Sequence, residues 1–110
     1  MDDIVAAFAA LDIRTGTIVE ASPLEGARKP AFRLRIFFGA LGARTSTAQL
    51  TERYSPESLV GKQVLAVLNL PVKRIAGVAS EVLTLGVADE RGAVVLVAPD
   101  SRVPDGSRLY

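Results

Sequence analysis

Apolar and polar residues alternate most regularly over residues 31–38 of the chain. Every second position is apolar, at Phe32, Leu34, Ile36 and Phe38, and the positions between them hold Arg33, Arg35 and Phe37. Successive side chains of a strand point to opposite faces of a sheet. The pattern therefore predicts a strand over 31–38 with one buried face and one wet, basic face.

Other segments are predicted as strands from their β-branched and apolar residues and from the Gly and Pro that bound them. These strands are expected over 13–21, 44–50, 63–70, 81–87 and 93–98. Gly16 interrupts the first of them, which suggests a bulge or a bend. In the fourth, Leu83, Leu85 and Val87 share one face. Turns or loops are expected over 22–30, 39–42 and 71–77.

Two short helices complete the prediction. Residues 3–11 are predicted as a helix because its apolar residues fall on one face, namely Ile4, Val5, Phe8 and Leu11. Such a short helix is marginal alone in water, so its apolar stripe must dock on another surface. The polar segment 51–61 is helix-like or irregular, with Ser55-Pro56-Glu57 favouring a helix start.

Many short strands with closely spaced turns predict a small all-β barrel. No repeat, low-complexity tract or linker divides the sequence, so we expect one domain over residues 1–110. The run Val94–Val97 is apolar at every position and needs cover on both faces. Together with the N-terminal helix, this run favours a twofold homodimer. In the alternative arrangement, the helix caps the run within one chain.

Composition excludes most familiar catalytic chemistry. The sequence contains no Cys, which removes disulfides, thiolate nucleophiles and Cys-ligated metal sites. It contains no His, which removes imidazole ligands and the usual general base near neutral pH. There is no G-x-S-x-G motif, and Gly61-Lys62 lacks the rest of a phosphate loop. We expect a binding protein rather than an enzyme, with no cofactor and no metal.

The first residues, Met1-Asp2-Asp3, are acidic where a signal peptide begins with basic residues. The apolar stretch that follows is too short to span a bilayer. Both observations predict a cytoplasmic protein that does not insert into membranes.

Charge is nearly balanced overall, at +1, but it is unevenly distributed along the chain. Residues 26–51 carry five cations and residues 62–80 carry three, and neither segment contains a carboxylate. Most of the cations are Arg, whose planar guanidinium binds phosphate in two places. If the segments lie side by side, they form a basic face suited to structured RNA. Alternatively, they are ordinary solvated strand faces whose partners lie elsewhere in the fold.

Three segments carry a family resemblance, and their sequences are LDIRTG at 11–16, STAQLT at 46–51 and NLPVKRIAGVASEVL at 69–83. ARKP at 27–30 and VVLVAPD at 94–100 extend it. On these motifs the chain resembles the tRNA-binding domain family, and in particular its stand-alone CsaA-type secretion chaperones. The resemblance implies an OB-fold, a five-stranded barrel extended by a short N-terminal helix and C-terminal strands, that forms a homodimer. Relatives appended to tRNA synthetases hold tRNA by its shape, whereas CsaA-type members keep precursor proteins competent for export and associate with the SecA translocase.

The resemblance also assigns candidate contacts. The family's RNA contacts correspond to Asn69, Lys73, Arg74 and Ser80, with Lys29 or Arg28 from the earlier loop as companions. From the residues themselves, a loop constrained by Pro71 and Gly77 presents Lys73 and Arg74 to a phosphate. Alternatively, the pair is simply two solvated loop cations. The candidate peptide-binding residues are Phe32, Phe37 and Phe38, which either line an apolar groove at the dimer surface or belong to the core.

Three functions follow as expectations. The first is an export chaperone that binds unfolded or precursor polypeptides as a homodimer. The second is a structure-selective tRNA-binding protein, and the third is a passive assembly subunit that delivers a partner enzyme.

Overall fold

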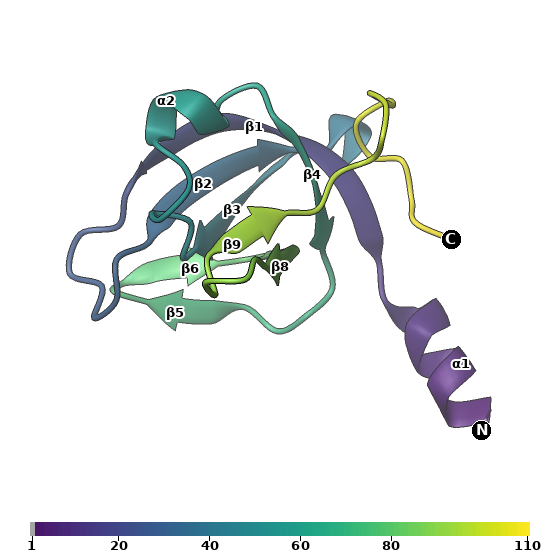
Figure 1. The fold of residues 1–110 in the computed structure, drawn as a ribbon. Coiled ribbons are helices and arrows are strands. Elements are labelled where there is room, and N and C mark those ends of the chain that lie inside the picture. The colour runs from purple at the N-terminus through teal and green to yellow at the C-terminus, as the bar shows by residue number, and fades with distance from the viewer. Residues whose placement is uncertain (1) are drawn as a thin grey trace.

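The computed structural model describes residues 2–110 and shows a five-stranded antiparallel sheet that curls into a nearly closed barrel (Figure 1). Its strand order is β3-β2-β1-β4-β7, and the strands are β1 (Ile13–Pro23), β2 (Phe32–Phe37), β3 (Ala43–Ala48), β4 (Gln63–Val67) and β7 (Leu83–Thr84). This architecture is an OB-like barrel, which confirms the predicted fold class.

Two hairpins and three short helical segments are attached to the barrel. The hairpins are β5 (Lys73–Ile75) with β6 (Val78–Ser80), and β8 (Gly86–Ala88) with β9 (Val94–Leu96); the helices are α1 (Asp2–Ala10), the 3₁₀ turn η1 (Gly39–Leu41) and α2 (Pro56–Leu59). Ser55 caps α2 as expected, because its side chain accepts a hydrogen bond from the Ser58 N–H.

The structure corrects the predicted elements on the C-terminal side of β4. The expected loop 71–77 contains strand β5, and the expected single strand 81–87 is divided into β7 and β8. Leu83 and Val87 are 50% and 59% exposed, so the apolar face predicted for residues 81–87 does not pack into the core of a single chain. Short-range alternation cannot distinguish a buried face from one that the monomer leaves open.

The core fills the barrel and is formed by the alternating side chains of β2 together with residues from β1, β4 and α2. Ile18, Leu34, Ile36, Phe38, Leu59 and Val64 are fully buried. Gly16 serves this packing: a Cβ there would lie 2.6 Å from the Phe38 ring and 2.7 Å from the Ile36 side chain. Of the bulge or bend predicted at Gly16, the bulge is wrong, because Gly16 pairs in register with Val64 and the irregularity in β1 falls between Ile18 and Glu20.

The barrel closes between β3 and the β6–β7 segment, and much of this seam is formed by side chains. The Ser46 hydroxyl, which is fully buried, donates to the Val82 carbonyl at 3.0 Å and lies 2.8 Å from the Thr84 hydroxyl. The Glu81 N–H donates to the Thr45 carbonyl at 2.8 Å. These contacts replace the regular ladder of hydrogen bonds that joins the other neighbouring strands.

Helix α1 extends away from the barrel, with every residue from Asp3 to Ala10 exposed (Figure 1). Ile4 and Val5 are 74% and 72% exposed, so the helix does not cap the apolar run around β9. That alternative is wrong for the single chain, and Val94–Val97 remains only half-buried. Within residues 2–110, no helix has the length and hydrophobicity needed to cross a membrane.

Candidate functional site

The β5–β6 hairpin presents the basic residues that the sequence singled out. Ala76 and Gly77 form its two-residue turn with φ angles of 50° and 80°, as in a type I′ turn. Gly adopts such angles freely, whereas Ala adopts them only at a conformational cost. Lys73 and Arg74, on the strand that leads into this turn, are both exposed.

Two side chains fasten the hairpin to β3. The Ser80 hydroxyl accepts a hydrogen bond from the Thr47 N–H at 3.1 Å, and the Glu81 carboxylate accepts one from the Thr45 N–H at 2.8 Å. Arg35 lies beside the same carboxylate, with 3.6 Å between its Nη1 and the Glu81 Oε1. Ser80 and Glu81 therefore act first as positioning residues for the hairpin.

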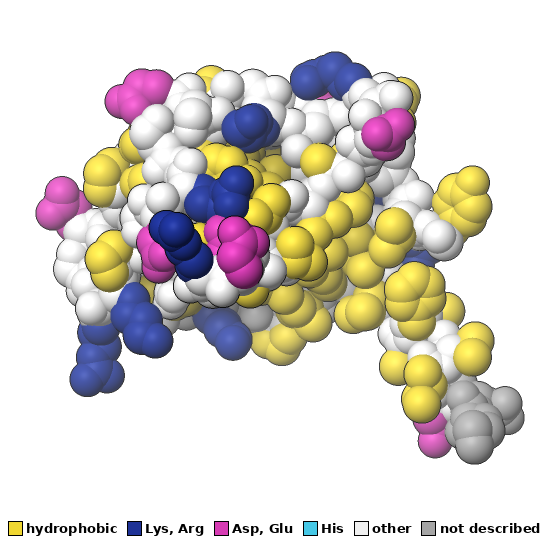
Figure 2. Space-filling view, viewed as in Figure 1, with side chains coloured by type: hydrophobic (Ala, Val, Ile, Leu, Met, Phe, Trp, Pro, Cys, Tyr) yellow, Lys and Arg dark blue, Asp and Glu magenta, His cyan; other side chains and the backbone are white. Residues whose placement is uncertain are grey.

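A hollow of about 580 Å³, hollow A, lies where three segments distant in the sequence meet. It is lined by residues 26–29 and 31 of the β1–β2 loop, 47–49 at the end of β3, and 74–76 at the hairpin tip. The hollow brings together the predicted residues Arg28, Lys29 and Arg74. Lys and Arg side chains gather in the same region of the surface, at the lower left of Figure 2.

A second hollow of about 370 Å³, hollow B, also borders the hairpin. Thr47, Lys73 and Ile75 line it together with residues 70–71 and 80–83. Thr47 and Ile75 line both hollows, so the two adjoin. The predicted residues Lys73 and Ser80 thus belong to hollow B, next to the three cations of hollow A.

The four cations of these hollows carry charge that the described chain does not neutralise. Among residues 3–110, no carboxylate lies within ion-pair distance of Arg28, Lys29, Lys73 or Arg74. The side chain of Arg74 makes only a long contact of 3.5 Å to the Gly77 carbonyl at the hairpin tip. The arrangement can therefore attract an anionic or electron-rich ligand.

The predicted basic face is smaller than the sequence suggested. Arg35 is paired with Glu81, and Lys62 lies beside Tyr54 and the C-terminal segment, where it lines another hollow with Gln63 and Arg102. For Arg35 the alternative prediction holds, because this solvated cation has its partner, Glu81, elsewhere in the fold. Of the cations in the two acid-free segments, Arg28, Lys29, Lys73 and Arg74 line hollows A and B.

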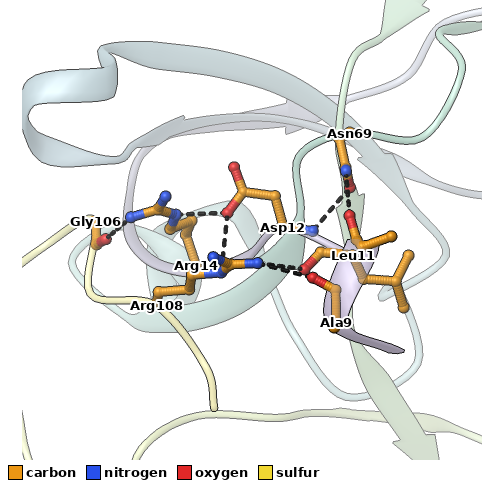
Figure 3. Close-up of polar contacts among 8 residues, drawn as sticks. Ala9, Leu11, Asp12, Arg14, Asn69, Gly106 and Arg108 are labelled. Carbon is orange, nitrogen blue, oxygen red and sulfur yellow. Dashed lines mark hydrogen bonds and ion pairs between the residues drawn. The ribbon is translucent and has the colours of Figure 1, made fainter. Parts of the chain in front are cut away.

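Asn69 lies outside both hollows and joins the end of α1 to the barrel through two hydrogen bonds (Figure 3). Its amide nitrogen donates to the Ala10 carbonyl at 2.7 Å, and its amide oxygen accepts from the Asp12 N–H at 2.8 Å. Arg108 donates to the carbonyls of Ala9 and Leu11 at 3.0 and 3.3 Å. Asn69 therefore holds the end of α1 on the barrel, one residue before Leu70 of hollow B.

The structure divides the three candidate peptide-binding phenylalanines. Phe32 and Phe38 are 6% and 0% exposed and belong to the core, so their assignment to a surface groove is wrong. Phe37 points outward and is 42% exposed, but it lines neither hollow A nor hollow B. The apolar lining that the sequence did not reveal includes Ala31, Ala48, Leu70, Ile75, Val82 and Leu83.

A separate charged cluster stabilises the β8–β9 turn. The Arg53 guanidinium donates to the Asp89 Oδ2 at 2.8 Å, and the Asp89 Oδ1 accepts from the N–H groups of Arg91 and Ala93, each at 2.9 Å. The hydrogen bond from Arg53, followed by those from the backbone, lowers the pKa of Asp89. Because the carboxylate is already saturated by its own turn, this cluster is structural.

Comparison with known proteins identifies the family. Residues 13–108 match the model described as a putative tRNA binding domain. The chain belongs to the tRNA-binding domain family. The methionine–tRNA ligase of Porphyromonas gingivalis is 39% identical over 102 residues, which cover 93% of this chain. The chain spans only 15% of that ligase's length.

Solved structures of similar length give the same fold. The crystal structure of chaperone CsaA from Bacillus anthracis has a TM-score of 0.91 and 48% identity, and the match covers 96% of each chain. The CsaA chaperone protein from Picrophilus torridus has a TM-score of 0.89 and 41% identity, covering 96% of this chain and 97% of that one. These comparisons confirm the family resemblance drawn from the sequence motifs.

Proposed function

We propose that this member of the tRNA-binding domain family is a CsaA-like export chaperone that binds unfolded or precursor polypeptides as a homodimer in the cytoplasm. The observation that carries the proposal is the pair of adjoining hollows A and B, whose apolar lining is bordered by four unneutralised cations. The similarity to chaperones named CsaA over nearly the whole of both chains supports it.

The chemistry is reversible binding. An extended polypeptide exposes apolar side chains at regular intervals, and transfer of these side chains from water into an open apolar hollow is favourable. Hollows A and B are partly open to solvent, which suits segments of varied sequence better than one small ligand of fixed shape. Binding of this kind delays aggregation because it covers apolar surface that the unfolded chain exposes.

The exposed apolar surface of α1 supports the homodimer in this proposal. Phe8, Leu11 and Ile13 line a third hollow, of about 440 Å³, together with Arg108, Leu109 and Tyr110 from the C-terminal end. A monomer gains nothing from leaving this surface in water. A second copy of the chain that covered α1 and the half-buried run at β9 would bury both apolar surfaces in one twofold interface.

A second candidate function is structure-selective tRNA binding, and the four cations at the hollows favour it specifically. Phosphate contacts dominate the affinity of proteins for nucleic acids, and RNA helices are recognised through shape and backbone. The family match also supports this candidate. Lys73 and Arg74 on the hairpin, with Arg28 and Lys29 opposite, are the residues that would contact phosphate.

Salt dependence separates the two candidates. We would titrate the protein with tRNA and with an apolar peptide flanked by serines, which stands in for an unfolded precursor segment, at about 50 mM and about 200 mM salt. With four phosphate contacts, affinity for tRNA should fall roughly a hundredfold over this range, because counterions are released on binding. Affinity for the peptide should change much less, since its apolar contacts are not screened.

The chaperone proposal expects saturable peptide binding at both salt concentrations. Peptide binding that is absent at both concentrations, together with tight and steeply salt-dependent tRNA binding, would replace it with the second candidate. Light scattering at micromolar concentration should report a dimer, and a clean monomer would remove the homodimer from the proposal.

A further inference from the structure

We infer that the preferred polypeptide of hollows A and B carries a carboxylate side chain next to its apolar residue. This inference rests on the proposed chaperone function and deepens it by naming the class of substrate. Its basis is the charge complementarity of two adjoining hollows whose lining has been described above.

Hollow A is the anionic half of the proposed recognition site. Its three charged lining residues are all cations, namely Arg28, Lys29 and Arg74. They line the hollow from the β1–β2 loop and from the hairpin, together with apolar residues that include Ala31 and Ala48. A carboxylate entering here meets positive charge from two sides, whereas a lysine or arginine meets like charge.

Hollow B is the apolar half. Leu70, Val82 and Leu83 line it, and its one carboxylate belongs to Glu81. That carboxylate accepts the Thr45 N–H at 2.8 Å and lies 3.6 Å from the Arg35 guanidinium. Glu81 is therefore occupied and neutralised by its own fold, and it leaves the Lys73 charge of this hollow uncompensated.

Because hollows A and B adjoin, they limit how far apart the acidic and the apolar residue of a bound segment can lie. Thr47 and Ile75 line both hollows, so a bound segment passes from one to the other across this shared boundary. An extended chain advances about 3.3 Å per residue. The acidic and apolar residues of the segment must then lie within a few positions of one another, in contrast to a segment in which a basic residue flanks the apolar core.

A panel of three labelled peptides tests the inference. Each peptide has the same short apolar core, flanked by two aspartates, two serines or two lysines, and binding to the full-length protein is measured by fluorescence anisotropy. At about 50 mM salt, we expect the aspartate peptide to bind about tenfold more tightly than the serine peptide, and the lysine peptide to bind more weakly than both. At about 200 mM salt, the difference between the aspartate and serine peptides should shrink to about threefold or less.

Variants locate the preference. The double variant Arg28→Ser, Arg74→Ser removes one cation from each side of hollow A, and it should abolish most of the preference while retaining affinity for the serine peptide. The matched control Lys62→Ser, Arg91→Ser removes two exposed cations that line neither hollow and should keep the preference. All four sites are exposed, so both variants should fold, which circular dichroism can verify.

The outcomes separate the inference from the function on which it rests. Equal affinities for the three peptides, or tightest binding of the lysine peptide, would overturn the acidic preference and leave the chaperone proposal standing. Loss of the preference in the Lys62→Ser, Arg91→Ser control would also overturn it. Absence of binding by every peptide, with tRNA still bound, would overturn the chaperone proposal itself and the inference with it.

Discussion

The barrel wall formed by β1–β4 and the β5–β6 hairpin are both antiparallel β-structure, but they use their side chains in opposite ways. In the wall, alternate residues of β2 are buried and the neighbouring strands pair over long registers. In the hairpin, the three residues of β5 are exposed, and two side chains, Ser80 and Glu81, fasten it to β3. The comparison shows a rigid support that carries a short, solvent-facing element whose side chains remain available to a ligand.

The largest expected effect concerns the wall. Phe38→Ala removes a fully buried ring from the centre of the core, next to Gly16 and Ile36. We expect the free energy of unfolding to fall by about 3–5 kcal/mol, because the cavity adds to the lost transfer energy. Denaturant unfolding monitored by circular dichroism measures this loss. The neighbouring variant Phe37→Ala is the control and should lose about 1 kcal/mol or less, since its ring is half in water; equal losses would contradict the division between core and surface.

The next effect concerns the hairpin and should appear in binding. The double variant Lys73→Glu, Arg74→Glu reverses two exposed charges that make no ion pair in the described chain. We expect affinity for tRNA to fall about thirtyfold or more at about 50 mM salt, because phosphate contacts become repulsions. The free energy of unfolding should stay within about 0.5 kcal/mol of the wild-type value. Unchanged tRNA affinity would remove RNA recognition from this hairpin.

The seam between wall and hairpin should show an intermediate effect on stability. Ser46→Ala removes a buried hydroxyl and leaves the Val82 carbonyl and the Thr84 hydroxyl without this partner. Loss of a buried hydrogen bond of this kind destabilises by about 1–2 kcal/mol. Differential scanning calorimetry should show a lower Tm for Ser46→Ala, while the exposed control Ser101→Ala should be neutral. A neutral Ser46→Ala would mean that the seam does not hold the barrel closed.

The smallest effect concerns the turn of the hairpin. Ala76→Gly relieves a left-handed backbone conformation, so we expect a gain of about 0.5–1 kcal/mol in the free energy of unfolding. The same substitution three residues later, Ala79→Gly in β6, should lose about as much, since glycine weakens an ordinary strand. Urea denaturation of the two variants side by side gives the comparison. Two changes of the same sign would show that the turn geometry does not determine the result.

The wall was predictable from the sequence because its signal is local. Alternation over 31–38 places four side chains in the core, and period-two burial in the structure follows it. The predicted arrangement on the C-terminal side failed because β5, β7 and β8 are short and mostly unburied, so alternation there carries little information. Assignment of Phe32 and Phe38 to a groove failed for the reverse reason, since the core needs every large residue on that face of β2.

The candidate site was predictable only in part. The motif residues Arg28, Lys29, Lys73 and Arg74 come together at adjoining hollows, as the two acid-free segments suggested. The role of Asn69 at the α1–β1 junction depends on hydrogen bonds between residues far apart in the chain, which no local pattern encodes. The same holds for Glu81, whose neutralisation depends on the packing of β3 against the hairpin.

Amide chemical-shift mapping during titration with the aspartate-flanked peptide tests the central claim most directly, because it reports where the ligand lies on the surface. The account predicts that perturbed amides cluster in residues 26–31, 47–49 and 70–83, around hollows A and B, while the β8–β9 turn stays unchanged. Perturbations confined to α1, the C-terminal segment or the β8–β9 turn would contradict it.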